Sequence, residues 1–193
     1  MSVLIIGLVL LLGTHSISIA APAWAERTSQ RIGDNAWRGV YSVFSLAGLV
    51  VTVYGYSIAR AELVIFYVPP LWLKYFAVAL LFFVFPILLS AFFPGRIKTT
   101  LKHPMLVATK LWATAHLLAN GARADVILFG AFLVWAAADR ISLKRRAERP
   151  LPEARFSPRN DIIAVVAGLG IFVALVSGLH AWLFGVPVPG PWN

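Results

Sequence analysis

Long runs of apolar residues are the feature that most limits what this sequence can fold into. A helix needs about 20 mainly apolar residues to cross a bilayer, and backbone polar groups in hydrocarbon must be hydrogen bonded within the protein, so such runs are expected to be helical. Hydrophobic residues make up 60% of the 193 residues and charged residues only 13%. The sequence therefore predicts an all-α fold, a polytopic bundle of transmembrane helices, and excludes an ordinary water-soluble domain.

Six apolar runs, separated by polar or turn-forming residues, are predicted to be spans, and the fourth and fifth are short. The runs lie at 3–20, 37–59, 71–93, 103–119, 126–139 and 162–184. The fourth and fifth runs could instead form a shallow hairpin that returns to the same side of the membrane. The sequence contains no internal repeat, so residues 1–193 are predicted to form a single transmembrane domain with the lipid bilayer around it.

The basic residues are concentrated in or beside the first, third and fifth connections between these runs. Positive charge marks the cytoplasmic side of a membrane protein, so both termini are predicted to lie on the periplasmic side. This distribution explains the formal charge of +9 better than nucleic-acid binding does, and no nucleic-acid partner is expected. The residues are Arg27, Arg31, Arg38, Arg96, Lys98, Lys102, Lys110, Arg140, Lys144, Arg145, Arg146, Arg149, Arg155 and Arg159.

The first run could also be read as a cleaved signal peptide, because Ala-Trp-Ala at 23–25 resembles a cleavage site of small residues. A signal peptide carries positive charge before its apolar run. Here no basic residue precedes the run, whereas arginines follow it. This pattern favours a retained helix inserted with its N-terminus outside.

Ionisable side chains within a span are costly, so each one is a functional candidate by default. All 8 acidic residues lie in connections or at helix ends, whereas all 4 histidines lie in or beside apolar runs. These histidines are His15, His103, His116 and His180. A neutral imidazole can bind a metal, carry a proton or pack by hydrogen bonding to a neighbouring helix. The absence of cysteine excludes thiolate metal sites and covalent haem attachment.

Helical spacing places Trp112, His116 and Asn120 on one stripe, where the amide could orient a ligand histidine. His15 in the first run and His180 in the last could each face His116. Two imidazoles from different helices, with no thiolate or carboxylate nearby, suit a non-covalent b-type haem better than zinc or calcium. Simple packing is the alternative interpretation of each histidine.

Three stretches carry a family resemblance. They are GTHSISIAAPAW at 13–24, PGRIKTTLKHPML at 94–106, and KLWATAHLLANG continuing to FGAFLVWAAADRISLKRR, which ends at Arg146. Together with WRGVYSVFSLAGLVVTVYGY at 37–56, they resemble the NnrU family. The resemblance implies a multi-pass protein of the bacterial inner membrane that is tied to denitrification, in nitrite and nitric oxide reduction. Components that mature the two reductases are the implied partners.

NnrU proteins are similar to the zeta-carotene isomerase family, whose members carry haem b with redox-dependent histidine ligation. Matching the HS of the first span and the histidine of AHLLANG makes His15 and His116 the implied metal ligands, while the isomerase activity is not carried over. In the six-span topology, His15 lies in the inner half of the membrane and His116 towards the outer end of its helix. His180 matches His116 better in depth and is therefore the alternative partner.

The frame KHP…ANG…WAAADR also resembles the isoprenylcysteine carboxyl methyltransferase family. That resemblance implies a pocket for S-adenosylmethionine at the cytoplasmic face, with His103, Asp139 and Arg140 as its residues. The tyrosine that follows the family's HP motif is absent, and KRR stands where an acidic pair is expected. Lys102, His103 and Pro104 could simply begin a helix at the headgroup level. A non-catalytic assembly factor or transporter for reductase maturation is a further alternative, so enzyme activity is left open.

Overall fold

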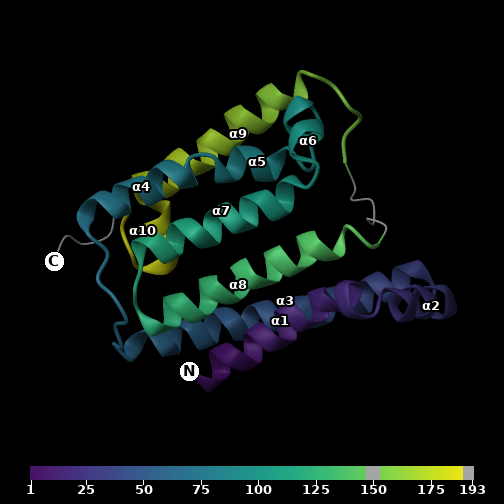
Figure 1. Ribbon diagram of the computed structural model, residues 1–193, viewed down its shortest axis with the longest axis horizontal. Coiled ribbons are helices and arrows are strands. Elements are labelled where there is room, and N and C mark those ends of the chain that lie inside the picture. Colours follow the sequence, from purple (N-terminus) through teal and green to yellow (C-terminus); the bar gives the residue numbers. More distant parts are fainter. Residues whose placement is uncertain (147–152, 189–193) are drawn as a thin grey trace. The chain divides into compact units, whose positions relative to one another are not determined.

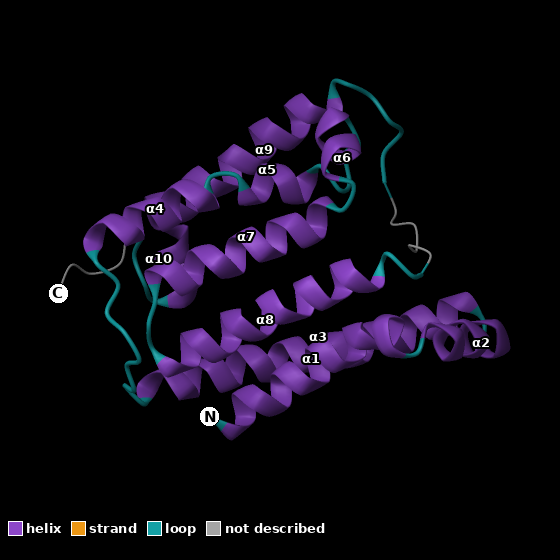
Figure 2. Cartoon of the chain, viewed as in Figure 1, coloured by secondary structure: helices purple, strands orange, loops and turns teal. Residues whose placement is uncertain are grey.

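Helices make up the regular secondary structure of the part of the chain that the structure describes. The computed structural model describes residues 1–146 and 153–188, and the one β-type pairing there is an isolated antiparallel bridge between Ile65 and Ala122. Figure 2 shows this all-helical character, which confirms the predicted all-α class. The chain divides into two compact units, and each is described by itself. Whether they form the predicted single domain stays a prediction.

Unit 1 consists of Met1–Phe66 and Ala122–Ala147. Its described residues form four helices, which can be followed by their labels in Figure 1: α1 (Ser2–Ala20), α2 (Pro22–Ile32), α3 (Asp34–Ala61) and α8 (Arg123–Ser142). The predicted spans 3–20, 37–59 and 126–139 correspond to α1, α3 and α8. Each of these helices begins before the first residue of its predicted span, and α3 and α8 also end after the last residue of theirs.

Small residues let α1 and α3 pack with their backbones in close contact. A Cβ atom added at Gly7 would lie 2.4 Å from the nitrogen of Thr52, and one at Gly48 would lie 2.6 Å from the nitrogen of Leu11. Gly55 makes the same kind of approach one turn further along. Glycine permits such contacts between membrane helices because no side chain separates the backbones. These contacts fix the antiparallel register of the two helices.

Helix α2 occupies a segment that the sequence analysis treated as a polar connection. Its first residue is Pro22, whose fixed φ and missing N–H suit the first turn of a helix. It ends at Gly33, which has a φ of +90° and reverses the chain into α3. The Trp24 and Trp37 rings, 5.8 Å apart, hold α2 against α3. A strongly polar helix therefore extends the hairpin of α1 and α3. Its charged residues had predicted a connection rather than a helix.

Polar pairs join α3 and α8 at one end of unit 1. The hydroxyl of Tyr56 donates to the buried carboxylate of Asp125, and Arg123 forms an ion pair with Glu62. Because α8 begins where α3 ends, the two helices run antiparallel.

Unit 2 consists of Tyr67–Gly121 and Glu148–Asn193. The predicted spans 71–93 and 162–184 are both interrupted here: the first by a turn at Phe82 and Phe83, the second by a π-helical turn in which Gly178 has a φ of +133°. The elements are α4 (Leu71–Leu81), α5 (Val84–Leu89), α6 (Arg96–Leu101), α7 (Pro104–Ala119), α9 (Asn160–Ala174), the π-helix η1 (Leu175–Leu179) and α10 (His180–Phe184).

The carboxylate of Asp161 organises the charged end of unit 2. Its oxygens accept hydrogen bonds from the backbone N–H groups of Arg96 at 2.9 Å and Ile97 at 3.1 Å. A Cβ at Gly95 would lie 2.3 Å from Asp161 Oδ1, so a side chain there would displace the carboxylate. Residue 95 must stay small for the start of α6 to meet the start of α9.

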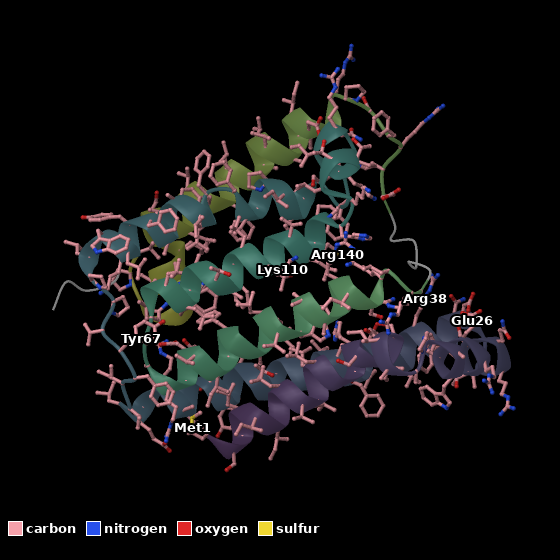
Figure 3. All side chains as sticks on the ribbon, viewed as in Figure 1. Met1, Glu26, Arg38, Tyr67, Lys110 and Arg140 are labelled. Carbon is pink, nitrogen blue, oxygen red and sulfur yellow. The ribbon has the colours of Figure 1, made fainter. Side chains whose placement is uncertain are left out.

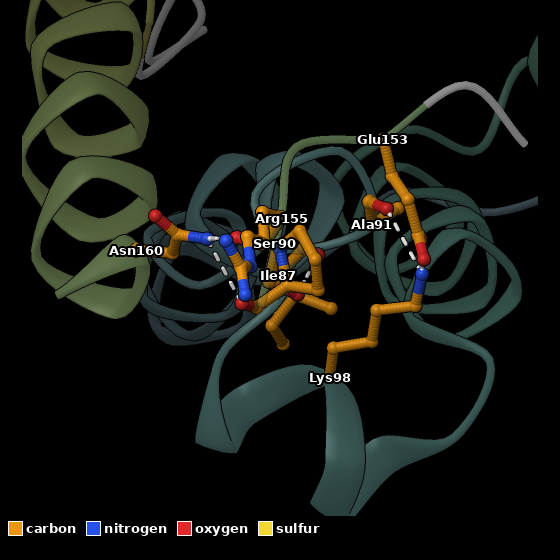
Figure 4. A network of polar contacts seen from close by, with 8 residues as sticks. Ile87, Ser90, Ala91, Lys98, Glu153, Arg155 and Asn160 are labelled. Carbon is orange, nitrogen blue, oxygen red and sulfur yellow. Dashed lines mark hydrogen bonds and ion pairs between the residues drawn. The ribbon is translucent and has the colours of Figure 1, made fainter. Parts of the chain in front are cut away.

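A second set of polar contacts lies beside this point (Figure 4). Asn160 donates to the carbonyl oxygens of Pro94 and Arg155, each at 2.9 Å. Lys98 forms an ion pair with Glu153 and also reaches the carbonyl of Ala91. The third and fifth predicted connections are thus tied together within unit 2.

Four of the described helical segments are long and apolar enough to cross a membrane. They are Ser2–Ala20, Asp34–Ala61, Leu71–Leu89 and Asn160–Phe184. Helices α7, with 16 residues, and α8, with 20, are not among the four. The protein is therefore a membrane protein with several apolar helices.

Charged side chains lie at both ends of unit 1. Figure 3 shows Glu26, Arg38 and Arg140 towards one end of the unit and Met1 towards the other. Arg38 and Arg140 belong to the first and fifth predicted basic connections. Arg149, which belongs to the fifth basic connection, lies outside the described residues.

Candidate functional site

His15 is the candidate ligand of unit 1, and its ring is held by its own helix. The half-buried imidazole places Nδ1 2.8 Å from the carbonyl oxygen of Leu11, one turn earlier on α1. A carbonyl only accepts hydrogen bonds, so Nδ1 is the donor and carries a proton. In the neutral ring, Nε2 then keeps its lone pair and is the nitrogen that can bind a metal.

Two aromatic rings from neighbouring helices restrict the same imidazole. The Tyr41 ring on α3 lies 5.4 Å from the His15 ring at 65°, and the Trp135 ring on α8 lies 5.9 Å away at 90°. Three helices of unit 1 therefore meet at His15. Tyr41 was not among the predicted site residues. Its helical spacing from Gly48 and Thr52, which lie on the α3 face that packs on α1, could have indicated it.

His116 is the candidate ligand of unit 2, and the predicted stripe is present around it. Its Nδ1 lies 2.9 Å from the carbonyl oxygen of Trp112, and the two rings are 5.3 Å apart. The amide of Asn120 donates to the backbone carbonyl of His116 at 3.0 Å, rather than to the ring. Because α7 ends at Ala119, this carbonyl lies in the last turn and is capped by the amide.

Tyr67 closes the same end of α7. Its hydroxyl donates to the carbonyl oxygens of Leu117 and Asn120, the latter at 2.8 Å. Nothing in the sequence indicates this tyrosine, which lies in an apolar connection far from Leu117 and Asn120 along the chain. The helix end that carries His116 is consequently held by side-chain amide and hydroxyl groups.

His180, the alternative ligand, begins α10 directly after the π-helical turn. Its Nδ1 lies 2.7 Å from the carbonyl oxygen of Val186, and its ring lies 4.9 Å from that of Phe184. The partner carbonyl comes after the helix, whereas the partners of His15 and His116 lie one turn before the histidine. His180 thus has a ligand-competent Nε2 in a different local arrangement.

The residues of the predicted methyltransferase-type pocket belong to different units. His103, in unit 2, precedes Pro104 at the start of α7, and its carbonyl accepts the N–H of Val107 at 3.1 Å. Asp139 and Arg140 lie in unit 1, where the buried carboxylate of Asp139 forms an ion pair with Arg146. Arg146 was predicted only as one of the basic residues of the fifth connection, and its ion pair with Asp139 was not predicted.

Two polar atoms of unit 1, like Nε of Arg123, are buried and have no hydrogen-bond partner within the described residues. They are Nε1 of Trp135 and Oγ of Ser45. A buried hydrogen-bond donor without an acceptor costs free energy in a soluble protein, and the cost is larger inside a lipid bilayer. Among the described residues, no group of three or more His, Asp or Glu side chains is arranged to hold a metal ion. The candidate ligands are therefore single histidines.

These features define the class of protein: a polytopic α-helical membrane protein with hydrogen-bonded histidines within its apolar helices. The family model described as NnrU protein matches residues 3–188, nearly the whole chain. The chain belongs to the NnrU family, which confirms the resemblance found in the sequence. No curated protein and no solved structure matches the chain.

Proposed function

We propose that this NnrU protein is a multi-pass protein of the bacterial inner membrane that binds haem b and supports denitrification, in nitrite and nitric oxide reduction. The family match supports the biological context. The haem proposal rests on one hydrogen-bond arrangement, which is found at two histidines. At both His15 and His116, Nδ1 donates to the carbonyl oxygen of the residue one turn earlier, at 2.8 and 2.9 Å.

An imidazole held in this way is prepared to bind iron. The bond to a carbonyl fixes the tautomer and orients the ring. Haem b can be held by histidine nitrogens without cysteine, and this chain has none. In the proposal, His15 and His116 would hold the haem. Trp135 and Trp112 pack beside these two ligand rings.

The residues of the chain would position the cofactor, and the cofactor would supply either one-electron redox chemistry or an iron that senses nitric oxide. The edge contacts of Tyr41 and Trp135 restrict rotation of the His15 ring. The amide of Asn120 and the hydroxyl of Tyr67 hold the helix end that carries His116. Apolar helices around both histidines would exclude water from the haem faces.

Six spans with both termini on the periplasmic side complete the proposal. The four long apolar segments supply four spans, and α7 and α8 supply the short fourth and fifth. At 1.5 Å per residue, α8 is about 30 Å long, close to the thickness of the hydrocarbon core. The basic connections support this orientation through the positive-inside rule.

Two other functions stay predictions. One is a methyltransferase-like enzyme that uses S-adenosylmethionine at the cytoplasmic face, and the other is a non-catalytic assembly factor or transporter for reductase maturation. The contacts of Asp139 with Arg146 and of His103 with Val107 have structural explanations, an ion pair and a helix start. Neither contact favours a methyl donor. Partners among the reductase maturation components are part of the proposal.

The absorption spectrum of the protein purified in detergent tests the proposal. We expect a Soret band in the oxidised protein that shifts on reduction by dithionite, with resolved α and β bands. A folded protein without a Soret band, expressed in a host that makes haem, would contradict it. Titration with S-adenosylmethionine by calorimetry in the same preparation tests the methyltransferase alternative.

A further inference from the structure

We propose that Trp135 and Ser45 donate hydrogen bonds to a carboxylate of the haem bound at His15. This inference rests on the proposed function and adds two residues to its site in unit 1. Its starting point is the pair of buried polar atoms, Trp135 Nε1 and Ser45 Oγ, which have no hydrogen-bond partner among the described residues.

The buried hydroxyl of Ser45 differs from three other hydroxyls in the same unit that are at least partly buried. Serine and threonine in helices commonly return the hydroxyl to the carbonyl one turn earlier. Thr14, Ser16 and Thr52 do so, donating at 2.7, 2.6 and 2.7 Å. The hydroxyl of Ser45 makes no such bond, although the carbonyl of Tyr41 lies one turn earlier on α3. The Ser45 hydroxyl is therefore available to a group outside its helix.

The buried Nε1 of Trp135 can act only as a hydrogen-bond donor. An indole N–H donates and never accepts, so the missing partner must be an acceptor. The indole ring already contacts the His15 ring at 5.9 Å, which places this donor beside the candidate ligand.

The register of unit 1 brings Ser45 to the same layer. Gly7 contacts Thr52 and Gly48 contacts Leu11, so each turn forward along α1 matches one turn backward along α3. One more turn in this register places Ser45 opposite Thr14, next to His15.

The α3–α8 pairing gives the same result. Ser45 precedes Tyr56 on α3, and Trp135 follows Asp125 on α8, each by about three turns. Because Tyr56 and Asp125 are in contact and the helices run antiparallel, Ser45 and Trp135 lie at nearly the same height in the unit.

Two neutral donors beside one imidazole suit an anionic oxygen. Hydrogen bonds to a charged acceptor are shorter and stronger than those between neutral groups, and a carboxylate within the membrane needs such donors. Haem b carries two carboxylates on flexible chains at one edge of the ring. A group bound through His15 Nε2 can therefore present a carboxylate oxygen to the layer that contains Ser45 and Trp135.

The test uses Trp135→Phe and Ser45→Ala, which remove the donors, and Trp135→Phe keeps an aromatic ring beside His15. Trp182→Phe, at a residue that is 80% exposed, and Ser57→Ala, at an exposed serine bonded to its own helix, are the matched controls. Transfer of haem from the protein to a haem scavenger is measured, together with the midpoint potential. We expect each site variant to release haem about tenfold faster or more. Each should also have a lower midpoint potential, because a less neutralised carboxylate favours ferric iron.

The identity of the acceptor is tested with the same variants reconstituted with haem b dimethyl ester, which lacks the carboxylates. The differences between the site variants and the wild type should then disappear. Equal differences with haem b and with its ester, or no difference from the controls, would overturn the inference while the haem proposal stands. If the wild type binds no haem at all, both proposals are wrong. Ser45→Ala decides the question by itself if Trp135→Phe does not fold.

Discussion

The rings of His15 and Trp135 meet edge to face, with their centroids 5.9 Å apart and their planes at 90°. The two residues come from the first and the eighth helices, and their contact closes a three-helix arrangement around one imidazole. Nδ1 of that imidazole is held by the carbonyl of Leu11, so the ring has one orientation and one available nitrogen. This geometry is the basis of the haem proposal.

Replacing the two candidate ligands should change the haem spectrum. We expect His15→Ala and His116→Ala each to lose haem or to lose the spectrum of a six-coordinate iron, because each removes one axial ligand. His180→Ala should leave the spectrum unchanged, and absorption spectra of the three purified variants check this. If only His180→Ala altered the bands, the assignment of His15 would be wrong.

A side chain at Gly48 should destabilise the packing of α1 against α3. In Gly48→Ala the new Cβ would lie 2.6 Å from the nitrogen of Leu11, so the helices must separate. We expect a loss of about 1–3 kcal/mol, as for other overpacked sites, measured by thermal unfolding in detergent. Gly39→Ala on the same helix is the control, since nothing lies within 4 Å of its Cβ. Equal melting temperatures for the two variants would show that the close contact is not present.

Loss of the Asp161 carboxylate should cost more than loss of a nearby ion pair. Asp161→Ala leaves the N–H groups of Arg96 and Ile97 without their acceptor, which should cost about 1–2 kcal/mol. Glu153→Ala breaks a partly exposed pair with Lys98 and should cost less than about 1 kcal/mol. Thermal unfolding of both variants gives the comparison. The reverse order would contradict the role of Asp161 in joining α6 to α9.

The hydrogen bond between Tyr56 and Asp125 should contribute to the stability of unit 1. Tyr56→Phe keeps the ring and leaves the buried carboxylate without this donor, so we expect a loss of about 1–3 kcal/mol. Tyr54→Phe, two residues away and 62% exposed, serves as the control and should change the melting temperature little. A loss as large in the control would mean that the hydroxyl of Tyr56 contributes nothing specific.

The absence of cysteine makes the topology directly testable with single introduced cysteines. In six spans, Arg123→Cys lies on the periplasmic side and Gln30→Cys on the cytoplasmic side. A membrane-impermeant maleimide added to intact spheroplasts should label Arg123→Cys alone, and lysis should expose Gln30→Cys. If Arg123→Cys stayed unlabelled before and after lysis, the shallow hairpin would be the better description of α7 and α8.

The helices were predictable from the sequence where an apolar run was long and uniform. Helices α1 and α3 follow the predicted spans within a few residues, because burial of an apolar run in lipid leaves the backbone no alternative to a helix. Helix α2 escaped prediction because its residues are polar and are held by Trp24, Trp37 and the turn at Gly33. The interruption at Phe82 leaves no mark in hydropathy, since the turn residues there are as apolar as their neighbours, and the one at Gly178 involves too few polar residues to divide the apolar run.

The candidate site was only partly predictable. The histidines were visible because ionisable residues are rare at membrane depth, and the stripe of Trp112, His116 and Asn120 follows from helical spacing. The role of the Asn120 amide as a backbone cap could not be predicted, because it depends on where α7 ends. Helical spacing places Tyr41 and Ser45 on the same face of α3 as Gly48, but their positions beside His15 depend on the register of α1 on α3, which glycine contacts set.

The electron paramagnetic resonance spectrum of the oxidised protein tests the central claim most directly, because it reports the axial ligands of ferric haem. The account predicts a low-spin signal typical of two imidazole ligands in the wild type, and a high-spin signal in any haem that His15→Ala or His116→Ala retains. A wild-type protein with no ferric haem signal, or a low-spin signal that survives both substitutions, would contradict it.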